Sequence, residues 1–90
     1  MDLFSNVREL TATEVAVFPN PVTSILQIQT EVFTACDWKV YDVTGRMMIA
    51  GKLNFSGGES TLDFSDLEKG VYVVILENDE LRFMSRVVKF

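Results

Sequence analysis

Short segments that alternate apolar and polar residues dominate this chain from residue 15 onward, and turn-forming residues separate them. Such segments, with turn signals recurring at about 8–12 residues, are typical of strands that pack in two antiparallel layers. The sequence therefore predicts an all-β fold, a seven-stranded antiparallel β-sandwich of immunoglobulin-like architecture with almost no helix. The predicted strands cover residues 15–18, 25–30, 38–43, 47–55, 61–64, 71–77 and 81–89.

Both prolines of the chain lie in one short stretch, VFPNPVTSILQIQ at residues 17–29. Each proline ring fixes φ and removes a backbone donor, so neither Pro19 nor Pro21 can serve in the centre of a sheet. The residue before each proline is pushed toward extended geometry. We therefore expect a stiff corner around Asn20, which ends one strand and directs the next.

Glycines mark two further corners. Gly45, in a Thr-Gly-Arg segment, provides a position for positive φ. The segment SDLEKG at residues 65–70 predicts a tight or one-turn helical corner that Gly70 ends. Leu67 in this corner is expected to insert into the core.

A chain of 90 residues forms one domain with one core. Burying a large apolar side chain contributes about 1.5–3 kcal/mol, and the strand phases place enough such side chains inside for independent folding. Residues 1–14 are weakly patterned, so we expect a linker or processing region there, followed by the sandwich of residues 15–90. The predicted core consists of Leu26, Ile28, Trp38, Val40, Leu62, Phe64, Tyr72, Val74 and Leu76.

The residue inventory argues against catalysis. The chain has no histidine, so the commonest general base and metal ligand is absent, and Ser–His or Cys–His nucleophile systems cannot form. The single cysteine, Cys36, is expected to be a small buried residue rather than a reactive thiol. We therefore expect no enzymatic activity, no bound metal and no cofactor.

Charge and hydropathy restrict the partners. The net charge is −5, whereas nucleic-acid binding requires a basic surface. No apolar run approaches the roughly 20 residues that span a bilayer, so we expect neither a nucleic-acid partner nor a transmembrane segment. The first residues do not combine a basic segment with an apolar one, so no signal peptide is expected either.

Three aromatic residues suggest a different function. Trp38, Tyr41 and Tyr72 could form a platform that stacks on sugars, as in small carbohydrate-binding modules. Trp38 and Tyr72, however, lie in strand phases that predict core positions. The platform is therefore an alternative hypothesis.

The last two strands are more apolar than a half-exposed sheet requires. Both faces of residues 71–77 are apolar, and residues 81–90 repeat this pattern. Two interpretations remain open. Either the strands are buried centrally, or they form a docking surface where an edge strand pairs with a partner or a second copy, which would make the domain a structural or dimerising module.

Four segments, in order, resemble motifs of the C-terminal sorting domains of type IX secretion cargo in Bacteroidetes. VFPNPVTSILQIQ is similar to an opening motif in which Pro-Asn-Pro precedes the first long strand. WKVYDVTGRMM resembles a strand that leads into Tyr-Asp and then Gly-Arg. STLDFSDLEKGVYVVIL resembles a polar strand, a Ser-x-Leu turn and then Gly-x-Tyr before an apolar strand. RFMSRVVKF resembles the terminal strand, and the whole match covers residues 15–90.

The resemblance implies an export signal without chemistry of its own. In this family a passenger lies upstream in the precursor, the outer-membrane translocon recognises the C-terminal domain, and a sortase-like cell-surface peptidase commonly removes it. The implied location is the periplasm in transit, and afterwards the outer membrane, the cell surface or the medium.

The resemblance also implies which residues act. Recognition by the translocon is assigned to the terminal strand, namely Arg86, Val87, Val88, Lys89 and Phe90, although Phe90 stands where many relatives end in a charged residue. The remaining motif positions are implied to be structural, with two glycines as geometric supports. They are Pro19, Asn20, Pro21, Tyr41, Asp42, Gly45, Arg46, Leu67, Gly70 and Tyr72.

Overall fold

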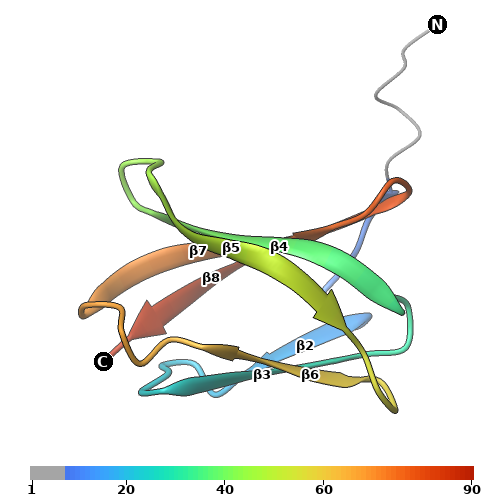
Figure 1. The fold of residues 1–90 in the computed structure, drawn as a ribbon, viewed down its shortest axis with the longest axis horizontal. Coiled ribbons are helices and arrows are strands. Elements are labelled where there is room, and N and C mark those ends of the chain that lie inside the picture. The colour runs from blue at the N-terminus through green and yellow to red at the C-terminus, as the bar shows by residue number, and fades with distance from the viewer. Residues whose placement is uncertain (1–7) are drawn as a thin grey trace, which may run out of the picture.

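The computed structural model describes residues 8–90, which form two β-sheets packed face to face (Figure 1). None of these residues is helical, so this part of the chain contains no helix that could cross a membrane. The strands are β1 (Arg8–Glu9), β2 (Val15–Phe18), β3 (Ile25–Thr30), β4 (Ala35–Asp42), β5 (Met47–Asn54), β6 (Glu59–Asp63), β7 (Gly70–Glu77) and β8 (Leu81–Lys89).

The two sheets differ in size. The large sheet contains five strands in the order β1-β8-β7-β4-β5, and the small sheet contains three in the order β2-β3-β6. Neighbouring strands run antiparallel except β1, which lies parallel to β8. In Figure 1 the end of β8 and the loop after β6 lie at the same end of the sandwich.

The two-layer all-β prediction is confirmed, but the count of seven strands, all antiparallel, is wrong. The additional strand is β1, whose two residues fall within the segment expected to be a linker. Leu10 directly after it is buried, with 7% of its surface exposed. A two-residue strand carries no period-2 pattern, so only its pairing with the far end of the chain reveals it. Residues 1–7 of the expected linker lie outside the described part.

Alternation along the strands places one face of each sheet in the core. In β3, for example, Leu26 and Ile28 are fully buried, whereas Ile25 is 43% exposed. The predicted core residues are all buried except Trp38, which is half-buried. Its ring lies so close to Gly51 that a Cβ there would sit 3.0 Å from it. The pattern did not select Phe33, which enters the core from the loop between β3 and β4.

Candidate functional site

Groups suited to catalysis or metal binding do not converge in residues 8–90. No cluster of three or more His, Cys, Asp or Glu side chains is placed there to hold a metal ion. Cys36 is buried in β4, and burial, followed by the charge of Asp37, raises the pKa of its thiol to about 11. Such a thiol is almost fully protonated at neutral pH, which makes it a poor nucleophile.

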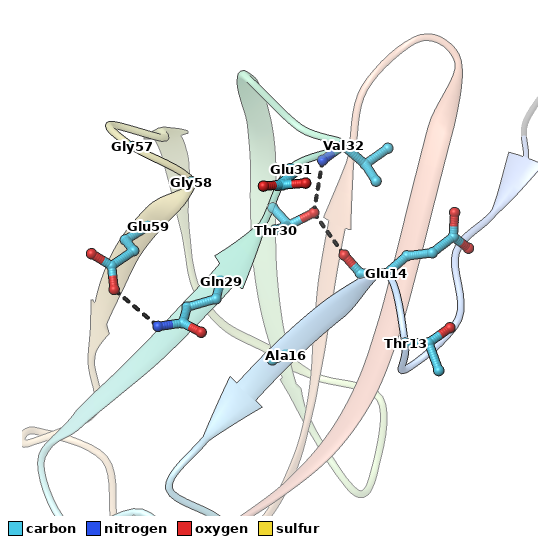
Figure 2. Close-up of a pocket in the computed structure, with 10 residues that line it drawn as sticks. All are labelled: Thr13, Glu14, Ala16, Gln29, Thr30, Glu31, Val32, Gly57, Gly58 and Glu59. Atoms are coloured by element: carbon cyan, nitrogen blue, oxygen red, sulfur yellow. Dashed lines mark hydrogen bonds between the residues drawn. The ribbon is translucent and has the colours of Figure 1, made fainter.

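An open hollow of about 560 Å³ lies where β2, β3 and β6 meet at one end of the small sheet (Figure 2). Several of its polar groups bind one another. The Thr30 hydroxyl donates to the Glu14 carbonyl at 2.9 Å and accepts from the Val32 amide at 3.0 Å. The Gln29 side chain donates to the Glu59 carboxylate at 2.9 Å. These bonds tie neighbouring strands together, so we interpret the hollow as a structural feature.

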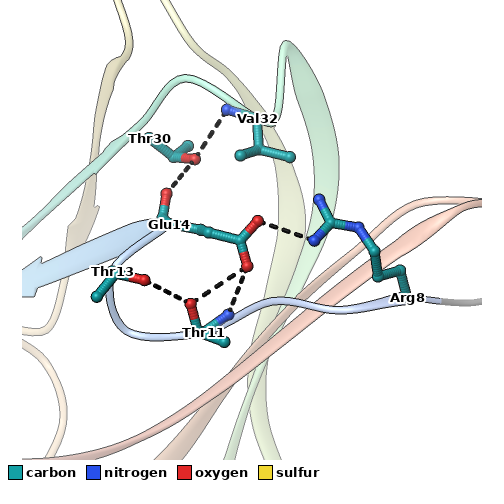
Figure 3. Close-up of polar contacts among 6 residues, drawn as sticks. All are labelled: Arg8, Thr11, Thr13, Glu14, Thr30 and Val32. Atoms are coloured by element: carbon teal, nitrogen blue, oxygen red, sulfur yellow. Dashed lines mark hydrogen bonds and ion pairs between the residues drawn. The ribbon is translucent and has the colours of Figure 1, made fainter.

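Glu14 extends this network toward β1 (Figure 3). Its carboxylate accepts from the Thr11 amide at 3.1 Å and from the Arg8 guanidinium at 2.9 Å. The hydrogen bond from the Thr11 amide, followed by that from Arg8, lowers the pKa of Glu14. Because this carboxyl group stays ionised, it can anchor residues 8–14 through these hydrogen bonds but is a poor proton donor.

The three aromatic residues of the carbohydrate hypothesis do not share a surface. Tyr72 is buried, and Trp38 faces the core against Gly51. Tyr41 pairs in register with Val73, which neighbours the buried Tyr72 in β7 and therefore faces away from the core. The three rings form no common stacking platform.

The five residues implied to contact the translocon divide into two groups along β8. Val87 is fully buried and Lys89 is only 8% exposed. Arg86 is exposed, Val88 is half-buried, and Phe90 after the strand is 66% exposed. The alternation of a strand makes Arg86 and Val88 available on one side while Val87 and Lys89 face the other.

Lys89 has a partner inside the domain. Its Nζ donates to the Leu67 carbonyl at 3.1 Å, in the turn between β6 and β7. Tyr72 holds the same turn, because its hydroxyl donates to the Glu68 carbonyl at 2.6 Å. Leu67 packs against the core from this turn, as the sequence predicts, and Gly70 at its end has a φ of 158°. The apolar stem of Lys89 allows this burial while its charge reaches a carbonyl group.

Asn20 joins the proline corner to the terminal strand. Its Nδ2 donates to the Arg86 carbonyl at 3.1 Å, and its Oδ1 accepts from the Val88 amide at 2.9 Å. Val22 continues this contact, since its amide donates to the Val88 carbonyl at 2.8 Å and its carbonyl accepts from the Phe90 amide at 2.9 Å. The corner that Pro19 and Pro21 form therefore covers the edge of the last residues of β8.

The Tyr-Asp and Gly-Arg motif forms a compact turn between β4 and β5. Asp42 Oδ1 accepts from the amides of Thr44 at 2.9 Å and Arg46 at 3.0 Å, while Gly45 adopts a φ of 89°. The hydrogen bond from the Thr44 hydroxyl, followed by that from the Arg46 amide, lowers the pKa of Asp42. Asp42 pairs in register with Tyr72, so this turn lies at the end of the sandwich that holds the chain end.

The structure thus brings the first, third and fourth motif segments into contact. We call the group that joins them the chain-end cluster. The sequence missed Val22, whose only local signal is an apolar residue directly after a proline. The cluster consists of Asn20, Val22, Leu67, Arg86, Val88, Lys89 and Phe90.

Comparison with solved structures gives low-identity matches. A thermostable endoglucanase single mutant from Alicyclobacillus acidocaldarius superposes with a TM-score of 0.59 at 19% identity, over 86% of this chain but only 15% of that one. The sulfur carrier protein SoxY from Chlorobium limicola f thiosulfatophilum superposes with a TM-score of 0.51 at 13% identity, over 92% of this chain and 81% of that one. These identities show a shared fold alone. No curated protein sequence matches the chain.

A family model gives the functional assignment. The model described as "Secretion system C-terminal sorting domain" matches residues 16–89, which is most of the chain. The matched region contains both sheets apart from β1 and Val15, the first residue of β2, together with most of the chain-end cluster. The chain therefore belongs to the secretion system C-terminal sorting domains, the signals of type IX secretion that send an upstream passenger to the cell surface or the medium.

Proposed function

We propose that the outer-membrane translocon of the type IX system recognises this domain at the chain-end cluster while the passenger is still in the periplasm. The observation that supports the proposal is the set of hydrogen bonds that fixes the terminal strand with Arg86 and Phe90 exposed. A folded chain end presents the same side chains whatever passenger lies upstream. A general address signal requires this property. The domain has no catalytic role in this proposal.

Within the terminal motif we propose two roles. Val87 and Lys89 are buried and hold the strand in the sandwich, so their contribution to export is indirect. Arg86, Val88 and Phe90 supply the direct contacts. This division refines the sequence hypothesis, which assigned all five residues to the translocon.

We propose that removal of the domain by a sortase-like peptidase occurs before Arg8. The Arg8 amide donates to the Glu80 carbonyl at 2.8 Å, and the Leu10 amide donates to the Arg82 carbonyl at 2.7 Å. Peptide bonds held in a sheet in this way are poor protease substrates. The processing region then precedes Arg8, and the sorting domain begins with β1.

We also infer an immunoglobulin-like topology. The sheets β2-β3-β6 and β8-β7-β4 correspond to strands A-B-E and G-F-C of that fold, with β5 added in the position of C′. Tyr72 near the start of β7 supports the correspondence, because its hydroxyl bonds the backbone of Glu68 just upstream. This is the arrangement of the tyrosine corner, which occurs at the start of strand F.

Export of a reporter passenger fused to residues 1–90 tests the proposal in a bacterium that has a type IX system. We expect the passenger at the cell surface or in the medium, and the mass of the product then locates any cut. Deleting residues 82–90 would remove the buried Phe83 and Val87 and unfold the domain. The informative variant is therefore Arg86→Ala with Phe90→Ala, and Ile25→Ala, at an exposed site of the small sheet, is its control.

The double variant should leave the passenger in the periplasm, and the control should be exported normally. Normal export of the double variant would refute recognition at the chain end. A wild-type fusion that stays in the periplasm would refute the export function itself.

A further inference from the structure

The edge of β8 is occupied at both ends. At its start, Leu10 donates to the Arg82 carbonyl from the parallel β1. At its end, Asn20 and Val22 form hydrogen bonds with backbone groups of Arg86, Val88 and Phe90. Between these two contacts, Met84 is the one edge position of β8 at which no hydrogen bond to β1 or to the proline corner is formed within residues 8–90. A partner therefore cannot add a strand along the chain end without first displacing the proline corner.

The outer face of the large sheet, by contrast, is open. Figure 1 shows the small sheet on one side of the large sheet only. The residues of β7 and β8 that alternate with the buried ones face the other side, and most of them are apolar. Among the apolar ones, Met84 is 49% exposed and the others are half-buried. We call the following group the outer patch: Tyr41, Val71, Val73, Ile75, Met84 and Val88.

Arg86 is the charged residue that lies among the apolar members of this patch, whereas Lys39, Glu77 and Arg82 of the same face border it. It lies between Met84 and Val88 on β8 and pairs in register with Val73 of β7. Its side chain is exposed and forms no ion pair with residues 8–90. Two lysines of the same sheet differ, because Lys39 pairs with Glu77 at 3.2 Å and Lys52 pairs with Asp37 at 2.9 Å.

We propose that the export machinery docks side by side on the outer patch, with an apolar surface and a carboxylate that meets Arg86, and does not add a strand to the edge of β8. Contiguous exposed apolar surface is typical of protein interaction sites. An arginine without an internal partner adds charge complementarity, and arginine is enriched among residues that dominate binding energy. The inference rests on the proposed export function and specifies the surface that carries it.

A matched pair of lysine substitutions tests the surface. Met84→Lys places a charge in the outer patch, and Ile25→Lys places the same charge at a similarly exposed position (43%) of the small sheet. Both sites are exposed enough for the lysine to remain in solvent, and urea denaturation of each fusion protein verifies folding. We expect export of the fused passenger to fall about tenfold for Met84→Lys. A tenfold weaker affinity for the export machinery corresponds to a loss of about 1.4 kcal/mol of binding free energy. Ile25→Lys should be exported like the wild type.

The charge of Arg86 is tested separately. Arg86→Gln should reduce export, whereas Arg86→Lys keeps the positive charge and should restore most of it. If the side chain had only a structural role, Arg86→Gln and Arg86→Lys should not differ in export according to their charge. Sedimentation of the wild type and of Met84→Lys shows whether a second copy uses the same surface.

Each outcome decides the inference. Reduced export for Met84→Lys and Arg86→Gln, with normal export of the two controls, supports docking on the outer patch. Equal export of Met84→Lys and Ile25→Lys overturns it while leaving the export function intact. A wild-type dimer that Met84→Lys dissociates without loss of export also overturns it, because the patch would then be an interface between copies. Failure of the wild-type fusion to leave the periplasm refutes the export function and, with it, the inference.

Discussion

Replacing Asn20 with alanine tests whether the proline corner holds the terminal strand. The substitution removes the hydrogen bonds to the Arg86 carbonyl and from the Val88 amide. One intramolecular hydrogen bond contributes about 0.5–1.5 kcal/mol, and water can replace part of this at an exposed site. We therefore expect the free energy of unfolding to fall by about 1–2 kcal/mol. For a domain of this size, Tm should decrease by roughly 5–15 °C.

Two measurements report this change at different levels. Urea denaturation gives the free energy of unfolding, and the fluorescence of Trp38, the single tryptophan, follows it. Hydrogen exchange reports the chain end directly. The Val88 amide loses its acceptor in the variant and should exchange faster, as should the neighbouring Phe90 amide. The Val74 amide in the centre of the large sheet should be affected only through global unfolding.

Two further variants make the test specific. Asn54→Ala is the matched control, because Asn54 is an exposed strand residue whose side chain makes no hydrogen bond with residues 8–90. Its unfolding free energy should change by less than about 0.5 kcal/mol. Asn20→Asp keeps an acceptor for the Val88 amide but loses the donor, so it should lie between wild type and Asn20→Ala. If Asn20→Ala matches Asn54→Ala in urea midpoint and the Val88 amide exchanges at the wild-type rate, the corner does not hold the strand.

Two predictions concern other parts of the sandwich. Gly51→Ala places a Cβ 3.0 Å from the Trp38 ring, so we expect a shifted fluorescence spectrum and a loss of about 1–3 kcal/mol; an unchanged spectrum and urea midpoint would contradict this. The Thr44 hydroxyl bond chiefly lowers the pKa of Asp42, so the stabilisation is present above the unfolded pKa of about 3.9 and is lost as the pH falls through the folded pKa. Between about pH 5 and pH 2, the urea midpoint should fall less in Asp42→Asn than in wild type, and equal pH dependence would disprove this role.

The strands could be predicted from the sequence because each one buries a single face. In β6, Leu62 is buried between exposed neighbours, and β3 alternates in the same way. The central strand β7 is the exception, since its outward residues are also apolar and half-buried. From the sequence, the second face of β7 could be either buried or a docking surface. The structure shows that the small sheet covers only one side of this strand.

Contacts between distant segments leave no such local signal. β1 and Asn20 both reach β8 through backbone groups or one amide side chain, which the hydrophobic pattern does not record. Lys89 illustrates a different difficulty. A charged residue near the chain end suggests an exposed contact, but its long apolar stem allows burial with the ammonium group at the Leu67 carbonyl. The prediction therefore located the strand of the candidate site without separating its buried residues from its exposed ones.

This separation gives the terminal strand two tasks that do not interfere with each other. Val87 and Lys89 face inward, so substitutions there should change the stability of the domain first and export only as a consequence. Arg86 and Val88 face outward while Asn20 fixes their backbone, so substitutions of their side chains should change export at constant stability. Stability and export measured on the same set of variants therefore distinguish the two faces. If inward and outward substitutions both reduced export in proportion to the loss of stability, β8 would have no face that the export machinery recognises.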